Sequence, residues 1–141
     1  MSPVSRAILL VFVGGTLGSM ARLTVSLLLY QHYLGAGNHY TVAMAATLAV
    51  NVIGSLALGA LAALRQHKRI PAMLWLLLGV GGLGAFTTFS AMALDTFIAI
   101  QLAHWSLAGL YVVATIAGSV SAAALSYVWT LYLTRSPRVS A

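Results

Sequence analysis

Hydroxyl and amide side chains recur at regular intervals in a chain that is otherwise strongly apolar. Two sets repeat every fourth residue: Thr47, Asn51, Ser55 and Gly59, and later Tyr111, Thr115 and Ser119. Residues four apart lie on the same face of a helix. The later set forms a ladder of neutral hydroxyls, which can coordinate a small dehydrated anion step by step without a fixed charge that would trap it.

Asn51 permits two interpretations. An amide in the middle of an apolar helix needs hydrogen-bond partners, and bonds between neighbouring membrane helices contribute only about 0.6–2 kcal/mol each. Asn51 therefore either joins two helices or has a functional role, and the spacing alone leaves both open.

A second unusual segment runs from Gly79 to Ser90, inside an apolar stretch from Pro71 to Ile100. It holds four glycines and three hydroxyl side chains. In hydrocarbon, backbone that leaves helical geometry costs several kcal/mol per unpaired group unless protein or a polar cavity receives it. Glycine loosens a helix, and threonine and serine oxygens can satisfy the freed groups. The segment therefore predicts a membrane helix that is broken at mid-depth, which is a common way to build an ion site.

Arg22 is an ionisable residue inside the first apolar run. One interpretation is that its guanidinium extends to the lipid headgroups, since Arg22 lies about two turns from the end of the run. The other is that its charge faces the bundle interior or a vestibule, where ionisable residues in membranes usually belong. Small residues nearby, such as Gly14 and Gly18, allow another helix to approach closely.

The composition places these residues in a membrane. Hydrophobic residues make up 61% of the 141 positions and charged residues 6%, which leaves almost no surface for water. The absence of cysteine excludes disulfides and thiolate–metal sites. An enzyme is not expected, because Asp95 is the only acidic residue and offers no acid–base pair. The histidines fall in loops or at the ends of apolar runs without metal-ligand spacing: His32, His39, His67 and His104.

Four apolar runs separated by polar breaks predict an all-α membrane protein. Each run is close to the roughly 20 residues that cross a hydrocarbon core about 30 Å thick. The expected spans are approximately 7–30, 41–64, 71–100 and 106–133, so that residues 1–141 form a single four-span membrane domain. The first run lacks a small-residue cleavage site and is expected to be a retained span rather than a signal peptide. The tail 134–141 is expected to be disordered.

The basic residues predict the orientation of these spans. Six of them lie in the N-terminus, the second loop and the tail, and none in the first and third loops: Arg6, Arg65, Lys68, Arg69, Arg135 and Arg138. Because cytoplasmic loops are enriched in lysine and arginine, both termini are expected in the cytoplasm. The net charge of +6 is then a topology signal and an attraction to anionic membrane lipid, and nucleic acid is not expected as a partner.

Three motifs together resemble the signatures of the Fluc/CrcB fluoride channel family. They are Gly14-Gly-Thr-Leu-Gly-Ser-Met-Ala-Arg22, Thr47-Leu-Ala-Val-Asn51-Val-Ile-Gly54 and Gly81-Gly-Leu-Gly-Ala-Phe-Thr-Thr-Phe-Ser90, in the order and at the separations expected for that family. The third motif is the most specific, and the resemblance covers all four spans.

This resemblance implies a fluoride-selective channel that exports cytoplasmic fluoride passively and so reduces its toxicity. It implies a multi-pass protein of the bacterial plasma (inner) membrane, assembled as a dimer of antiparallel subunits. It also implies a structural sodium ion at the dimer centre that is not transported. On this alignment the backbone carbonyls of Gly84 and Thr87 hold the sodium, which agrees with the preference of hard cations for oxygen ligands.

The same resemblance assigns the pore. Its residues are Asn51, Phe89, Ser90, Met92, Tyr111, Thr115 and Ser119. Phe89 matches a pore phenylalanine whose electropositive ring edge can face an anion, and Asn51 matches a pore asparagine that offers a neutral N–H donor. Arg22 and Asp95 match positions with a vestibule or structural role, and Asp95 stands where the family usually has glutamate.

Two features depart from the family pattern. Phe89-Ser-Ala-Met92 stands where members usually read Phe-Ser-Thr-Phe, so a flexible methionine replaces the second ring and Ala91 replaces a hydroxyl; Ala85 also replaces a glycine. The second departure is the charge bias, because a homodimer whose subunits insert in both directions needs nearly balanced loops. The partner is therefore either a second copy or an oppositely oriented homologue.

These departures give an alternative function, a non-conducting or partner-dependent subunit of a heterodimeric fluoride channel. A small four-span exporter of organic cations is not favoured. Proton-coupled exchange needs a carboxylate in a substrate pocket, and the chain lacks the aromatic cage that organic cations require.

Overall fold

The computed structural model describes residues 2–33 and 39–134, and this part of the chain is all helical apart from its connections. Four helical segments are long and apolar enough to cross a membrane: Pro3–His32, His39–Gln66, Ala72–Gln101 and Trp105–Thr134. The prediction of an all-α protein with four candidate membrane spans is confirmed. The tail 135–141, with two of the counted arginines, lies outside the described residues.

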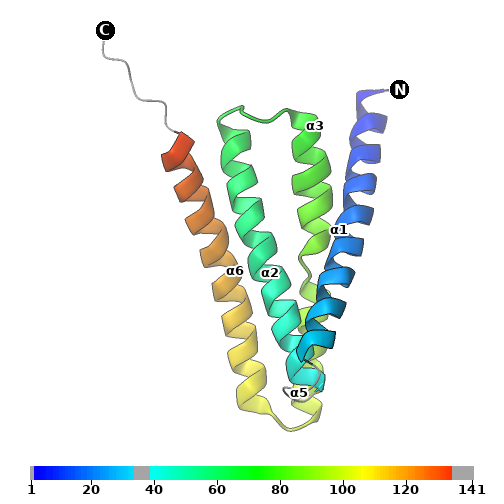
Figure 1. The fold of residues 1–141 in the computed structure, drawn as a ribbon, viewed down its shortest axis with the longest axis vertical. Helices are drawn as coiled ribbons and strands as arrows, with labels where there is room; N and C mark the ends of the chain where they lie inside the picture. Colours follow the sequence, from blue (N-terminus) through cyan, green and yellow to red (C-terminus); the bar gives the residue numbers. More distant parts are fainter. Residues whose placement is uncertain (1, 34–38, 135–141) are drawn as a thin grey trace.

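The spans alternate in direction and form an elongated bundle (Figure 1). Three of them are single helices, α1 (Pro3–Tyr33), α2 (His39–Gln66) and α6 (Trp105–Thr134). The start of α1, the end of α6 and the connection from α2 to the third span lie at one end of the bundle. We call it the basic end, because it holds every described lysine and arginine except Arg22: Arg6, Arg65, Lys68 and Arg69.

The third span is interrupted. It consists of α3 (Ala72–Leu74), a π-helix η1 (Trp75–Leu83), α4 (Gly84–Phe86) and α5 (Phe89–Gln101). The backbone becomes extended at Thr87 (ψ 152°) and Thr88 (φ −146°, ψ 124°), and helical geometry resumes at Phe89. The glycines that predicted a break therefore stay helical, and the interruption follows them at two β-branched residues. Its depth in the membrane stays a prediction.

The glycines instead permit close contact between helices. A Cβ atom on Gly14 would overlap the carbonyl oxygen of Leu77, and one on Gly18 would overlap the carbonyl oxygen of Gly82. Helix α1 thus lies directly against the backbone of η1, its most extensive neighbour. Small residues are common at such contacts because dispersion attraction between membrane helices depends on short backbone separations.

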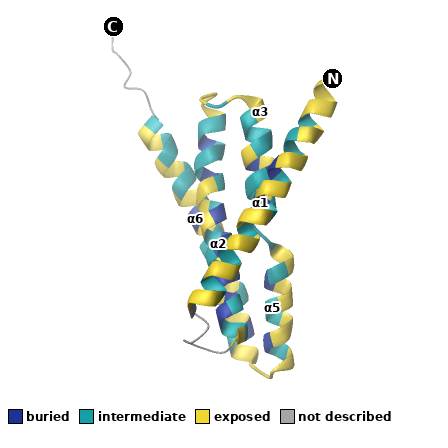
Figure 2. Cartoon of the chain, turned by 45° about the vertical axis from the view of Figure 1, so that its right-hand side comes forward, coloured by how far each residue is buried: buried dark blue, intermediate teal, exposed yellow. Residues whose placement is uncertain are grey.

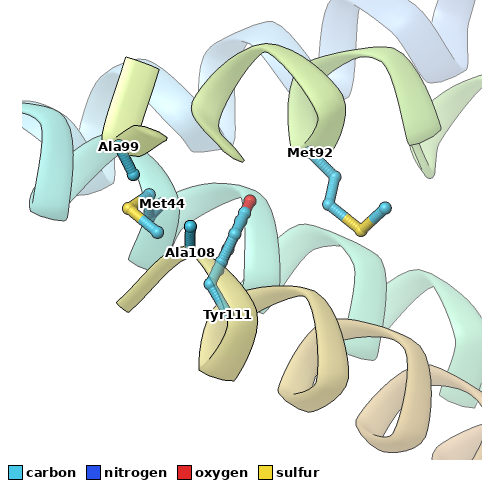
Figure 3. Close-up of a cluster of buried hydrophobic side chains, with 5 residues drawn as sticks. All are labelled: Met44, Met92, Ala99, Ala108 and Tyr111. Atoms are coloured by element: carbon cyan, nitrogen blue, oxygen red, sulfur yellow. The ribbon is translucent and has the colours of Figure 1, made fainter. Parts of the chain in front are cut away.

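Helices α2 and α6 form the other extensive contact, and α5 packs beside α6. A buried cluster fills the space between these three helices (Figure 3): Met44, Met92, Ala99, Ala108 and Tyr111. The outer surface of the bundle is exposed along all four spans (Figure 2) and is rich in large apolar side chains. Such a surface suits lipid rather than water, as expected for a multi-pass membrane protein.

Two arginines of the basic end bind main-chain carbonyls. Arg65 donates to the carbonyl oxygen of Ile70 (3.2 Å), and Arg69 donates to the carbonyl oxygen of Thr134 at the last turn of α6 (2.6 Å). The carbonyls of a last helical turn lack intrahelical partners and attract cations. Arg69 therefore fixes the end of α6 to the connection between α2 and α3.

Candidate functional site

Asn51 binds the interruption of the third span directly. Its side-chain nitrogen donates to the carbonyl oxygen of Thr88 (2.9 Å), and its side-chain oxygen accepts from the backbone nitrogen of Thr88 (2.7 Å). The side chain is 6% exposed, so these bonds are shielded from lipid and water. Of the two interpretations of Asn51, the joining role is present in the structure. The second N–H of the amide stays available to another acceptor.

These bonds leave carbonyl groups free on the other side of the interruption. In a continuous α-helix, Gly84 would accept from the nitrogen of Thr88, and Thr87 would accept from the nitrogen of Ala91. Here Thr88 donates to Asn51 instead, and Ala91 donates to the hydroxyl oxygen of Thr88 (3.2 Å). The two carbonyl oxygens predicted to hold sodium have therefore lost their helical partners.

A cavity of about 450 Å³ lies beside this interruption, between α2, α5 and α6. We call it the hydroxyl cavity. Five predicted pore residues line it: Asn51, Phe89, Met92, Thr115 and Ser119. Both predicted sodium ligands, Gly84 and Thr87, also line it, as do Ser55 and Thr88. The structure thus brings most of the predicted site residues to one place.

Two hydroxyls of this cavity have no partner among the described residues. The Oγ1 atom of Thr115 and the Oγ atom of Ser119 are buried without a hydrogen bond, and Thr115 is only 2% exposed. A buried polar group without a partner costs about 1–3 kcal/mol, so such groups usually receive a water or a ligand. The unpaired hydroxyls face the same cavity as the amide of Asn51.

Phe89 and Met92, which follow the interruption, lie in different surroundings. Phe89 lines the cavity but is 75% exposed, whereas Met92 is 5% exposed and joins the buried cluster. Ser90 lies within hydrogen-bond distance of the hydroxyl of Thr88 (3.2 Å) and does not line the cavity. Met92 therefore belongs to both the cavity wall and the core.

Tyr111 is separate from the other members of the hydroxyl ladder. It lies in the buried cluster with its hydroxyl directed toward α5 (Figure 3), and it donates to Oδ2 of Asp95 (3.0 Å). Asp95 acts here as a hydrogen-bond anchor that joins α5 to α6. Neither residue lines the hydroxyl cavity.

Arg22 lines a second cavity of about 570 Å³ between α1 and α2, whose wall also includes Thr47 and Ala91. The residue is half-buried, and its buried Nε atom has no hydrogen-bond partner within the described ranges. Thr47 lies one turn from Asn51 on α2, so this cavity is next to the hydroxyl cavity along the helix. The placement agrees with the interpretation in which the charge of Arg22 faces a cavity.

Sequence reasoning did not single out Thr88 as a residue of this site. Its backbone receives both bonds from Asn51, which is 37 positions away in the sequence. No local pattern marks such a pair. The only signal is the presence of an amide on one span and an extended two-threonine segment on another.

Comparison with known proteins gives consistent matches. The model of the family described as CrcB-like protein, Camphor Resistance (CrcB), matches residues 9–127. A protein of Saccharophagus degradans named fluoride-specific ion channel FluC is 37% identical over 123 residues, which cover 86% of this chain and 87% of that protein. Proteins of the same name from Gloeobacter violaceus and Magnetococcus marinus are 38% and 40% identical, over 86% and 84% of this chain and 94% and 92% of their own lengths.

Proposed function

This chain belongs to the CrcB-like family, as its three motifs predicted, and from that premise we propose that it is a fluoride-selective channel. The channel exports cytoplasmic fluoride passively and reduces its toxicity. Relatives that are 37–40% identical to it over the aligned residues carry the name of fluoride-specific channels, which supports this assignment over an enzyme.

One observation carries the proposal at the level of residues. The hydroxyl cavity offers an anion the unpaired O–H groups of Thr115 and Ser119 and the free N–H of Asn51, without a charged side chain in its wall. Neutral donors can replace part of the hydration shell of a small anion and still release it, as conduction requires. The ring edge of Phe89 adds a weak electropositive surface at the mouth.

The driving force is the membrane potential. An inside-negative potential supplies about 2.3 kcal/mol per elementary charge per 100 mV, so an anion leaves the cell without a coupled ion. The positive charge of Arg22 lies at the neighbouring cavity, where it raises the local concentration of anions before they meet the neutral donors. The attraction of anions is thus assigned to Arg22, and their passage to the neutral donors of the hydroxyl cavity.

The sodium ion of the proposal is structural. The carbonyl oxygens of Gly84 and Thr87 would hold it, because both lack helical donors and oxygen is the ligand that hard cations prefer. The ion would supply a fixed positive charge beside the interruption. Asn51 and Thr88 keep these carbonyls free of competing hydrogen bonds.

We place the protein in the bacterial plasma (inner) membrane with both termini in the cytoplasm and an antiparallel partner at its side. The described lysines and arginines other than Arg22 gather at one end of the bundle, which supports this orientation. The same bias keeps an oppositely oriented homologue open as an alternative to a second copy. A partner-dependent subunit therefore remains the second candidate function.

Fluoride efflux from liposomes separates these candidates. We expect the purified protein to release trapped fluoride, measured with a fluoride electrode and a potassium ionophore, and to retain chloride under the same conditions. Release only after addition of an oppositely biased homologue would favour the partner-dependent subunit. Equal release of chloride, or no release in either arrangement, would contradict the assignment to a fluoride channel.

Removal of sodium gives a second expected result. When all sodium is replaced by a large organic cation on both sides of the membrane, we expect efflux to stop and the thermal stability of the assembly to fall, since the free carbonyls lose their cation. Re-addition of sodium should restore both. Fluoride efflux that does not depend on sodium would argue against a site at Gly84 and Thr87.

A further inference from the structure

A groove separates α1 from the third span at the basic end. The two helices diverge there (Figure 2), and the space between them has a volume of about 320 Å³. Its walls come from the first turns of α1 and the start of the third span: Pro3, Arg6, Ala7, Leu10, Met73 and Leu76. We propose that this groove binds one anionic phospholipid, with Arg6 on the headgroup phosphate and an acyl chain along the apolar wall.

The groove continues a face of α1 that is covered farther along the helix. Arg6, Ala7 and Leu10 follow the three- and four-residue spacing of one helix face. Continued by four positions, that face reaches Gly14 and then Gly18, which lie against the backbone of η1. Near its start, α1 has moved away from the third span, and this face needs another apolar occupant.

The order of the side chains matches a phospholipid. Arg6 is nearest the end of the helix, and Ala7 and Leu10 follow toward the middle of the bundle, facing Met73 and Leu76. A lipid presents its charge at the membrane surface and its acyl chain inward, in the same order. Both helices are candidate membrane spans, so the groove opens to lipid. A free phosphate would gain nothing from the apolar wall.

The charge of Arg6 supports an anionic headgroup. The only acidic residue of the chain, Asp95, is on α5 and binds Tyr111, and the other arginines of the described basic end bind carbonyls. Arg6 also lies in the first turn of α1, where the helix dipole disfavours a cation. A phosphate beside Arg6 supplies a negatively charged partner and offsets the unfavourable interaction with the helix dipole.

Trp75, the first residue of η1, directly precedes the wall residue Leu76 and provides a reporter. We would keep Trp75, replace Trp105 and Trp129 with phenylalanine, and measure quenching of its fluorescence in phosphatidylcholine vesicles. Brominated phosphatidylglycerol and brominated phosphatidylcholine are compared at equal content. We expect a preference of about fivefold for the anionic lipid, since one basic residue near a membrane surface contributes about 1 kcal/mol.

Two variants and a control test the groove. Arg6→Gln should remove most of the preference, and Ala7→Phe should reduce quenching by both lipids because the ring fills the groove. Lys68→Gln removes the same charge from the same end outside the groove and should leave the preference in place. An equal loss with Lys68→Gln would show general electrostatic attraction and overturn the proposal. Loss of the preference when inorganic phosphate is added would also overturn the proposal, because it would show a site for free phosphate. Absence of quenching by both lipids would overturn it as well, because it would show that a second copy of the chain covers the groove.

Discussion

Substitution of Asn51 with aspartate should abolish fluoride efflux. A carboxylate beside the hydroxyl cavity repels the permeating anion by about 4 kcal/mol at a separation of about 4 Å and an effective dielectric constant of about 20. If the whole repulsion adds to the free-energy barrier for permeation, the rate of fluoride efflux falls about a thousandfold. The variant also replaces the N–H donor to the carbonyl of Thr88 with an oxygen.

A matched variant separates charge from structure. Asn51→Leu removes both hydrogen bonds to Thr88 without adding charge, and we expect it to lower stability as well as efflux. Both proteins should be compared by fluoride efflux and by cross-linking of the assembly in vesicles. If Asn51→Asp assembles and conducts at the rate of the unmodified protein, Asn51 does not line the fluoride path.

Gly18→Ala should strongly destabilise the contact between α1 and the third span. Its Cβ atom would overlap the carbonyl carbon and oxygen of Gly82, which are backbone atoms that cannot rotate away. Overpacking of this kind typically costs 1–3 kcal/mol, and we expect about 3 kcal/mol because backbone has to move on both sides. Equilibrium unfolding in mixed micelles would measure the difference.

Gly109→Ala is the corresponding control. It adds the same methyl group to α6 at a position where nothing lies within 4 Å of the new atom. Alanine has a higher helix propensity than glycine by up to about 1 kcal/mol, so we expect this variant to be equal to or slightly more stable than the original protein. Equal destabilisation by the two substitutions would show that contact with Gly82 is not the cause.

The existence of four spans was predictable because the thickness of the hydrocarbon core fixes the length of an apolar run. The residues at which the helices begin and end were harder to predict. Helix α1 begins at Pro3, four positions before the expected span, because the hydroxyl of Ser2 accepts from the nitrogen of Ser5 and proline suits the first helical position. Capping acts through single polar residues, which hydropathy does not register.

Candidate site residues could be named from the sequence, but their arrangement in space could not be derived from it. Residues four apart drift by about 40° per step on a helix of 3.6 residues per turn, so Tyr111 and Ser119 differ by about 80°. The ladder therefore divides, with Ser119 in the hydroxyl cavity and Tyr111 in the buried cluster. The position of the interruption depended on the pair formed by Asn51 and Thr88, which only the tertiary structure brings together.

The two halves of the third span have different main neighbours. Helix η1 and α4 pack chiefly on α1, whereas α5 packs chiefly on α6, and α2 contacts both halves. Thr87 and Thr88 are the covalent link between these halves, and the hydrogen bonds to Asn51 hold that link against α2. Any displacement of α1 relative to α6 is therefore expected to act first on Thr87 and Thr88, and the two hydrogen bonds from Asn51 oppose it.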